Sequence, residues 1–429
     1  MTVQVWDVRR IRCAMISTLP PTQCGLATFA QALSGGFASL GADVDLVRVL
    51  QEPRHRLAGL VQPAPDSVAT SLVPEPVTVP WAADRAGLQA TAEALNRYDV
   101  VILQHEYGIY GGPDGERVLS LLELVRAPVV TVLHTVLSRP SPRQHRVLRE
   151  VIAASAVVVT MTHLARARAV QVYGADPDCA VVIPHGAAED LVHGAETSGA
   201  VTSGVVSSGA VTSGSAPTGG RAPLVLTWGL LGRGKGIEWA IRAMSTLSDL
   251  DPHPHYLVAG RTHPRLSAKD GTGYRHELRT LAAELGVASA VTFDDRYLDA
   301  EALHALVRSA DVVLLPYDSL EQVTSGVLTE AVAAGRPVIA TRFPHAVELL
   351  GDGTGLLVDQ GDAGAIAQGL RRVLTEDGLA ERFSRRAEQL AAGLSWRAVA
   401  QEYLRVCTEA GHRDVVPGLR PTLDRVGAR

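Results

Sequence analysis

The chain is poor in several features that would point to particular classes of protein. Its four cysteines, Cys13, Cys24, Cys179 and Cys407, have no spacing typical of a zinc site or a disulfide framework. A net charge of -5 gives no support for nucleic acid as the main partner. No uninterrupted apolar run is long enough to cross a bilayer, and the first ten residues lack the apolar run of a signal peptide. These absences predict a cytoplasmic protein without a transmembrane segment.

The length and the apolar pattern predict two α/β domains. A chain of 429 residues exceeds what one hydrophobic core usually supports. Short apolar runs alternate with helical patterns from Arg12 to Ile183 and again from Leu224 to Val358. Such alternation predicts a doubly wound parallel sheet with helices on both faces, once in each half of the chain.

The expected domain limits follow from where this alternation stops. We expect an N-terminal Rossmann-like domain at 1–190, a linker or insertion at 191–222, a C-terminal Rossmann-like domain at 223–395, a helix at 396–411 and a tail at 412–429. The linker is assigned because Gly, Ser, Thr, Ala and Val recur in ETSGAVTSGVVSSGAVTSGSAPTGGRAP without helical or strand periodicity. A low-complexity segment of this kind buries little apolar surface.

The most informative segment lies between Leu314 and Thr341. It reads as a buried strand, a loop of small residues, a helix that begins after Thr324, and a second buried strand. Free N–H groups and the positive end of the helix dipole predict an anion site at the start of that helix. Glu330, one turn further on, is expected to accept hydrogen bonds from sugar hydroxyls. An ordinary βαβ unit has the same pattern, so this segment alone leaves both interpretations open.

A second basic motif, GLLGRGKG, follows the first strand of the second half. It has the GxxxxGK spacing of a Walker A loop, but Gly236 replaces the Ser or Thr that holds magnesium, which disfavours a nucleoside triphosphatase. Lysine occurs only at Lys235 and Lys269. We expect Arg233 and Lys235 to neutralise a diphosphate, with a solvated basic turn as the alternative.

The first half carries polar residues at the carboxyl ends of its strands, where open α/β sheets bind ligands. His105, Glu106 and Tyr107 follow one such strand and His134 follows the next. Their spacing matches no known metal site, so we predict a polar acceptor pocket. Core histidines satisfied by backbone groups are the alternative. Gly25, at the start of the first helix, lets a substrate approach the backbone, although a simple tight turn fits equally well.

Taken together, these motifs resemble the retaining glycosyltransferases of the GT-B fold, the glycogen-synthase-like or group 1 glycosyltransferases. The resemblance covers Arg12 to Ala410 and rests on the Pro-Pro-x-x-Cys-Gly loop, the strand ending in His134, Ile183-Pro184-His185-Gly186, the Gly234-Lys235-Gly236 turn and the Ser325–Gly335 helix. It implies two facing Rossmann-like domains and a C-terminal helix, beginning at Trp396, that crosses back to the first domain.

The resemblance also implies roles for individual residues. The expected catalytic residues are His134, Arg233 and Lys235. The expected donor-binding residues are Gly25, Arg261, Gln322, Ser325, Gly326, Val327 and Glu330. The expected acceptor-binding residues are His105, Glu106 and Tyr107. No metal ligand is expected.

The chain departs from the family pattern at three positions. Gln322 stands where the family has a glutamate, with Glu321 beside it. Leu230 stands where the family has an arginine, so we expect Arg233 or Arg261 to supply that charge. His185 replaces the asparagine of a Pro-Asn-Gly turn. The first of these changes puts the choice of sugar in doubt.

The sequence thus predicts a transferase of carbohydrate biosynthesis. We expect it to move a hexose, mannose or glucose, from a UDP- or GDP-linked donor to a hydroxyl of a saccharide, lipid or small molecule, without an essential metal. The resemblance alone implies that the anomeric configuration is retained. Peripheral contact with a membrane stays open. The alternatives are a nucleotide-sugar epimerase or a sugar phosphorylase on the same fold, and an inactive sugar-binding homologue.

Overall fold

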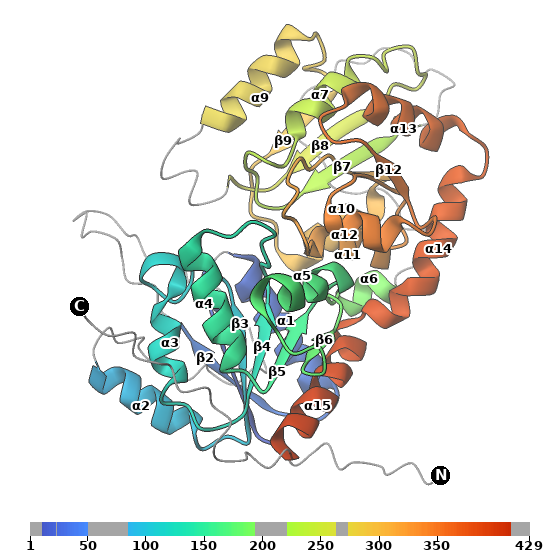
Figure 1. Ribbon diagram of the computed structural model, residues 1–429. Helices are drawn as coiled ribbons and strands as arrows, with labels where there is room; N and C mark the ends of the chain where they lie inside the picture. Colours follow the sequence, from blue (N-terminus) through green and yellow to red (C-terminus); the bar gives the residue numbers. More distant parts are fainter. Residues whose placement is uncertain (1–10, 23, 50–84, 194–220, 263–272, 413–429) are drawn as a thin grey trace. The chain divides into compact units, whose positions relative to one another are not determined.

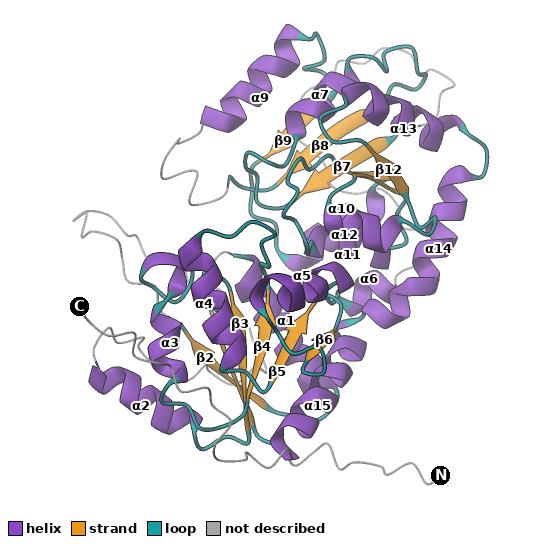
Figure 2. Cartoon of the chain, in the orientation of Figure 1, coloured by secondary structure: helices purple, strands orange, loops and turns teal. Residues whose placement is uncertain are grey.

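The structure is a computed structural model of the chain that describes residues 11–22, 24–49, 85–193, 221–262 and 273–412 (Figure 1). The chain divides into two compact units. The first comprises Met1–Gly186 and Trp396–Arg429, and the second comprises Ala187–Ser395. Each unit contains one parallel sheet with helices packed on it, so the two Rossmann-like domains predicted from the sequence are confirmed (Figure 2).

The sheet of the first unit has the strand order β2-β1-β3-β4-β5-β6. Its strands are β1 (Cys13–Ser17), β2 (Val44–Arg48), β3 (Val100–His105), β4 (Val129–Leu133), β5 (Val157–Thr160) and β6 (Ala180–Val182). Its helices are α1 (Gly25–Ser39), α2 (Arg85–Leu95), the 3-10 helix η2 (Pro113–Gly115), α3 (Arg117–Leu122), α4 (Pro142–Ala153), α5 (His163–Tyr173) and α15 (Trp396–His412). All residues of β1, β3, β4 and β5 are buried, as expected for strands covered on both faces.

The C-terminal helix completes the core of the first unit. Phe29 and Phe37 of α1 and Tyr403 of α15 belong to one hydrophobic cluster on the sheet. Gly36 allows the two helices to approach closely, since a Cβ atom there would lie 2.5 Å from the carbonyl oxygen of Trp396. The prediction that this helix crosses back to the first domain is therefore confirmed.

The sheet of the second unit has the order β12-β11-β10-β7-β8-β9. Its strands are β7 (Leu224–Trp228), β8 (His255–Ala259), β9 (Val291–Asp294), β10 (Val312–Leu315), β11 (Val338–Thr341) and β12 (Leu356–Val358). Its helices are α6 (Glu189–His193), α7 (Ile237–Met244), α9 (Gly273–Glu284), α10 (Ala300–Ser309), α11 (Gly326–Ala333), α12 (Pro344–Leu350), α13 (Ala363–Thr375) and α14 (Leu379–Leu394). Two hydrophobic clusters, one including Ile241 and Tyr256 and the other Leu328 and Phe343, fill this unit.

The boundary between the units differs in detail from the expected one. The division falls after Gly186, whereas the sequence places the end of the first domain at residue 190. Asp190 of α6 belongs to the second unit, where its carboxylate lies 2.8 Å from Nδ1 of His304 and 3.2 Å from the guanidinium of Arg308. The linker expected at 191–222 also begins too early, because α6 continues to His193. Residues 194–220 of this linker lie outside the residues that the structure describes.

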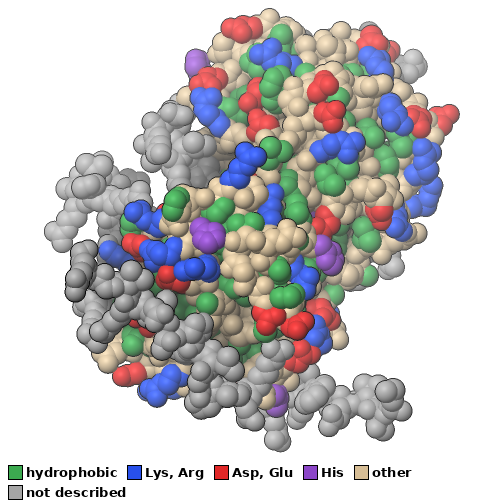
Figure 3. All heavy atoms as spheres, in the orientation of Figure 1, with side chains coloured by type: hydrophobic (Ala, Val, Ile, Leu, Met, Phe, Trp, Pro, Cys, Tyr) green, Lys and Arg blue, Asp and Glu red, His purple; other side chains and the backbone are tan. Residues whose placement is uncertain are grey.

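Acidic and basic side chains are interspersed over the visible surface of the second unit (Figure 3). Exposed pairs such as Arg371 with Asp249 and Arg386 with Asp352 fit this mixed distribution. Such pairs contribute little to stability. None of the described helices has the length and apolar character needed to span a bilayer.

Both sheets reverse their strand order next to their first strand. In the first unit β1 lies between β2 and β3, and in the second β7 lies between β10 and β8. Open parallel sheets bind ligands at the carboxyl ends of the strands where the order reverses. The β1/β3 and β7/β10 ends are therefore the places where a site is expected.

Candidate active site

In the second unit, the loops after β7 and β10 are packed directly on each other. Gly236 has a φ of 62°, and a Cβ atom there would lie 1.8 Å from the carbonyl oxygen of Pro316. Asp318 also donates its backbone N–H to the carbonyl oxygen of Gly234. Gly236 of the GLLGRGKG motif is thus needed for a close approach between the two loops at the β7/β10 reversal.

Lys235 lies within this pair of loops. Its Nζ is 3.9 Å from the centroid of the Tyr317 ring. Tyr317 is 1% exposed and stacks on Phe343, with ring centroids 4.9 Å apart. A cation over an aromatic face gains about 0.5–1 kcal/mol at an exposed site. The ammonium group is therefore held by a rigid, buried support at the point where a ligand is expected.

The amino end of α11, the helix that follows β10, supplies polar hydrogen atoms. Ser325 caps the helix, since its Oγ accepts the N–H of Leu328. Among the described residues, no acceptor is found for the N–H groups of Gly326 and Val327. The resemblance implies that Ser325, Gly326 and Val327 bind the donor, and the N–H groups of the last two thus remain available for a phosphate.

The third amide is already bonded. The N–H of Ser325 donates to Nδ1 of His345, at 2.8 Å, and the backbone N–H of His345 donates to the carbonyl oxygen of Gln322, at 3.3 Å. His345 begins α12 and is 5% exposed. No sequence motif indicates this residue, which follows Pro344.

Glu330 lies on α11, next to the end of β7. Its Oε2 accepts the indole N–H of Trp228 at 3.3 Å. Burial raises the pKa of the Glu330 carboxyl, and the hydrogen bond from Trp228 opposes that rise. A carboxylate held in this way keeps lone pairs for further hydroxyl donors.

The remaining donor residues make contacts of their own. The side-chain amide of Gln322 donates to the carbonyl oxygen of Thr324, within its own loop. Arg233 is paired with Glu277 of α9 at 2.8 Å and lies 5.4 Å over the Tyr274 ring. Arg261 follows β8 and is exposed. Arg233 therefore interacts with α9, while the neighbouring Lys235 interacts with Tyr317.

In the first unit, Gly25 and His134 lie on different elements around the sheet end. Gly25 is the first residue of α1, and no atom comes within 4 Å of the position that a Cβ would take there. His134 follows β4, and its Nε2 is 2.7 Å from Oε1 of Gln104. Burial, with the neighbouring His185 and His105, lowers the pKa of His134 to about 3. His134 is therefore neutral at physiological pH.

An aromatic cluster supports His134. The Phe29 ring contacts His134, His185 and Trp396 edge to face, with centroid distances of 4.8, 5.1 and 5.0 Å. Gly186 has no room for a side chain, because a Cβ atom there would lie 2.3 Å from the Trp396 ring. The Pro-His-Gly turn is thus part of the support of this sheet end.

The expected acceptor residues divide into buried and accessible ones. His105 is 1% exposed, its ring nitrogens have no hydrogen-bond partner among the described residues, and burial lowers its pKa to about 4. Tyr107 is also buried, and its hydroxyl donates to the carbonyl oxygen of Gln144 at 3.3 Å. Glu106 is partly exposed and accepts hydrogen bonds from the N–H of Tyr107 and the hydroxyl of Thr135. Within the described part of the chain, no backbone group satisfies the ring nitrogens of His105, so the alternative of a hydrogen-bonded core histidine does not describe this residue.

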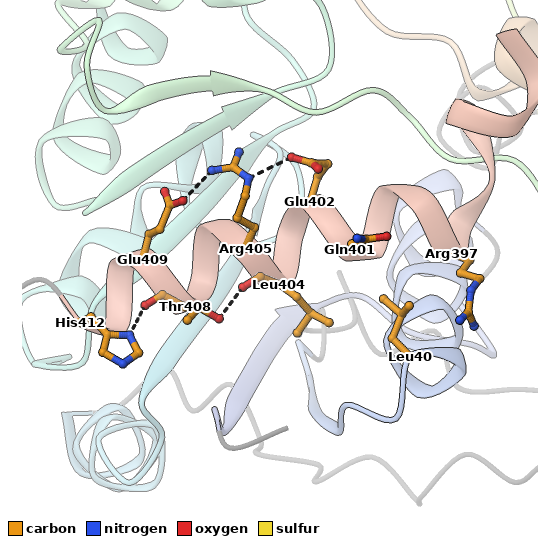
Figure 4. A pocket seen from close by; sticks show the side chains of 9 residues that line it. All are labelled: Leu40, Arg397, Gln401, Glu402, Leu404, Arg405, Thr408, Glu409 and His412. Atoms are coloured by element: carbon orange, nitrogen blue, oxygen red, sulfur yellow. Dashed lines mark hydrogen bonds and ion pairs between the residues drawn. The ribbon is translucent and has the colours of Figure 1, made fainter. Parts of the chain in front are cut away.

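Two further findings bear on where a ligand could bind. Within the described part of the chain, no three His, Cys, Asp or Glu side chains are grouped so that they could hold a metal ion. A pocket of about 550 Å³ lies along α15, but its Arg405 is paired with Glu402 and Glu409 (Figure 4). This pocket is on α15 and the end of α1, and it includes none of the site residues predicted from the sequence.

Comparison with known proteins settles the family. The sequence model of "Glycosyltransferase Family 4" matches residues 24–191, and that of "Glycosyl transferases group 1" matches residues 215–390. The chain belongs to the group 1 glycosyltransferases. The two matches fall on the two Rossmann-like units, which is the arrangement expected of the GT-B fold.

Named relatives and solved structures agree with this assignment. The chain is 29% identical, over 94% of its length and 91% of the relative's, to a D-inositol 3-phosphate glycosyltransferase from Acidothermus cellulolyticus. A protein of the same name from Corynebacterium jeikeium is 35% identical, but that match spans only 43% of this chain and 44% of the relative. A Rickettsia africae glycosyltransferase structure has a TM-score of 0.68 at 16% identity, covering 94% of this chain and 99% of that one. The Anabaena HepE structure with UDP and glucose has a TM-score of 0.65 at 15% identity, covering 93% and 100%.

Proposed function

We propose that this glycosyltransferase moves a hexose, glucose or mannose, from a UDP- or GDP-linked donor to a hydroxyl of a saccharide, lipid or small molecule. The names of relatives support a hydroxyl acceptor, since several are D-inositol 3-phosphate glycosyltransferases. The structurally similar Anabaena protein was crystallised with UDP and glucose and with UDP-glucose. Retention of the anomeric configuration is carried over from the resemblance to the family.

One observation carries the proposal: a cation follows β7 and a helix amino end follows β10, and these are the two neighbouring strands at which the strand order of the second unit reverses. Lys235 lies on the loop after β7, and the amides of Gly326 and Val327 lie at the start of α11, which follows the neighbouring strand β10. When the bond between the sugar and the diphosphate breaks, negative charge grows on the leaving phosphate. A fixed cation and fixed N–H dipoles stabilise that charge without rearranging.

The same arrangement suggests how the nucleotide is held. The Glu330 carboxylate, fixed by the indole of Trp228, accepts hydrogen bonds from the two ribose hydroxyls. This contact is made equally in the ground state and the transition state, so it contributes to donor affinity. Lys235 acts on the charge that develops during reaction and contributes to the rate.

The reaction balances without a further reactant. The bond between the anomeric carbon and the phosphate oxygen breaks, and the acceptor oxygen forms a new bond to that carbon. The proton of the acceptor hydroxyl passes to the leaving diphosphate. We propose that no metal is needed, because the ammonium group of Lys235 and the amino end of α11 supply the positive charge.

The test is a donor screen followed by product analysis. Each of UDP, GDP, UDP-glucose and GDP-mannose is added to the full chain, and the melting temperature is measured with and without EDTA. A ligand at 100 times its Kd stabilises the folded state by about 2.7 kcal/mol. We expect a higher melting temperature with one nucleotide and its sugar, unchanged by EDTA, and transfer to an acceptor detected by mass spectrometry. Stabilisation by none of the four, or hydrolysis without transfer in the presence of every acceptor class, would contradict the proposal.

A further inference from the structure

The side-chain amide of Gln104 joins two neighbouring strands at the β1/β3 reversal of the first unit. Gln104 is fully buried, near the carboxyl end of β3. Its Oε1 lies 2.7 Å from Nε2 of His134, and its Nε2 donates to the sulfur of Met15 on β1, at 3.3 Å. Met15 is fully buried as well. The three side chains thus form a row across β1, β3 and the end of β4.

Met15 sets the orientation of the amide. A thioether sulfur accepts hydrogen bonds weakly and donates none, so the NH₂ group of Gln104 faces it and the amide oxygen faces His134. The opposite orientation would place two acceptors, the amide oxygen and the sulfur, against each other in a buried site. A buried acceptor without a donor costs about 1–3 kcal/mol, which disfavours that orientation.

The amide in turn sets the tautomer of His134. A neutral imidazole has one N–H group, and its position is fixed by the partner of the other nitrogen. Because Oε1 of Gln104 only accepts hydrogen bonds, the proton of His134 lies on Nε2. Its Nδ1 therefore keeps a lone pair.

The nitrogen that carries this lone pair is not completely buried. Among the described residues nothing hydrogen-bonds Nδ1 of His134. This atom keeps some solvent exposure, whereas the two ring nitrogens of His105 are completely buried and also have no partner there. The edge-to-face contact with Phe29, at 4.8 Å between centroids, restricts rotation of the His134 ring. The ring is thus held with one nitrogen bonded inside the unit and the other able to reach a ligand.

We propose that Gln104, oriented by Met15, is a positioning residue that fixes His134 as the Nε2–H tautomer and so presents Nδ1 as a hydrogen-bond acceptor to a hydroxyl of the transferred sugar. The tautomer follows from this unit alone. The identity of the hydroxyl rests on the proposed function. Nothing in the sequence motifs assigns a role to Met15 or Gln104.

Nuclear magnetic resonance tests the tautomer directly. The full chain is labelled with ¹⁵N-histidine, and the His134 signals are assigned by comparison with His134→Gln. Long-range proton–nitrogen spectra then distinguish the protonated ring nitrogen from the unprotonated one. We expect Nε2–H in the wild type, and loss of that single tautomer in Gln104→Met and in Met15→Leu. The control Gln401→Met makes the same change at an exposed position of α15 and should leave the His134 signals unchanged.

The outcomes separate this inference from the proposed function. A wild-type Nδ1–H tautomer, or an unchanged tautomer in Gln104→Met, would overturn the positioning role, and the wild-type spectrum decides the matter even if a variant does not fold. With a donor and acceptor found by the screen, Gln104→Met should lower kcat about tenfold and leave the donor KM within about twofold, as expected for one lost hydrogen bond in the transition state. If Gln104→Met lost the single tautomer as expected but kept the wild-type kcat, the proposal that Nδ1 binds a substrate hydroxyl would be wrong. The proposed nucleotide site in the second unit would not be affected by that result.

Discussion

The backbone N–H of Ser325 donates a hydrogen bond of 2.8 Å to Nδ1 of His345, which ties the cap of α11 to the start of α12. Since the backbone N–H of His345 also bonds the carbonyl oxygen of Gln322, this single residue fixes both ends of the loop that precedes α11. The amino end of α11 is therefore positioned by a side chain that none of the sequence motifs indicates.

Two conservative substitutions at His345 should have opposite effects. In His345→Asn the amide lies close to the position of Nδ1 and can still accept the N–H of Ser325, whereas in His345→Gln the amide lies near the position of Nε2. We expect Asn to keep the affinity for nucleotide near the wild-type value and Gln to weaken it about tenfold, the usual effect of one lost hydrogen bond. Isothermal titration with the stabilising nucleotide measures both. Equal affinities for the two variants would show that His345 does not position this loop.

We expect the ionised carboxyl of Glu330 to lower the stability of the folded state at pH 7 and to strengthen donor binding. Its pKa is raised in the folded state by burial, so this group favours folding below its unfolded pKa and opposes it as pH rises through the folded pKa. Glu330→Gln should therefore raise the melting temperature at pH 7, with a difference that shrinks on acidification. The same change weakens hydrogen bonds to the ribose and should raise the donor KM at a cost of about 1–3 kcal/mol.

Calorimetry from pH 4 to pH 8 and steady-state kinetics check the two halves of this prediction. Trp228→Phe is the companion variant, because it removes the hydrogen bond to Glu330 and retains the charge. It should lower stability at pH 7. A melting temperature for Glu330→Gln that is the same as wild type across this range would contradict the burial argument, and an unchanged donor KM would contradict the ribose contact.

A pair of neighbouring glycines tests the packing of the C-terminal helix. A Cβ at Gly36 would lie 2.5 Å from the carbonyl oxygen of Trp396 and 2.9 Å from Cβ of Ala400, whereas one at Gly35 meets no atom within 4 Å. We expect Gly36→Ala to destabilise the first unit by about 1–3 kcal/mol through overpacking. Gly35→Ala, on the exposed side of the same helix, should stabilise it by about 0.5–1 kcal/mol. Denaturant unfolding measures both, and equal effects would mean that α15 does not pack closely on α1.

The fold could be predicted from the sequence because its strands are apolar throughout. Val100 to Leu103 and Val312 to Leu315 are buried on both faces of a parallel sheet, and such runs are visible without a structure. Trp396 likewise marked the start of the returning helix. The short helix α6 was missed, since five residues carry no helical periodicity that could be recognised.

The sequence reveals a structural role for an expected site residue only where backbone conformation requires a particular residue type. Gly236 and Ser325 left a signal because a close approach and a helix cap restrict the residue type. Gln104 and His345 left none, since their roles depend on partners that are distant in the sequence. For His105 the sequence left a polar pocket and a buried core histidine open, because the residues that surround a strand end are distant in the sequence.

The central claim is that the loops after β7 and β10 bind the diphosphate of the donor, and Lys235 tests it most directly. The measurement is kcat of Lys235→Ala with the donor and acceptor identified by the screen, beside Arg385→Ala, which removes one exposed positive charge from α14. We predict that Lys235→Ala lowers kcat about a hundredfold or more, since its ammonium group acts on charge that develops in the transition state. Arg385→Ala should match the wild type. A kcat for Lys235→Ala equal to that of the wild type would contradict this assignment, and the diphosphate site would then have to lie elsewhere.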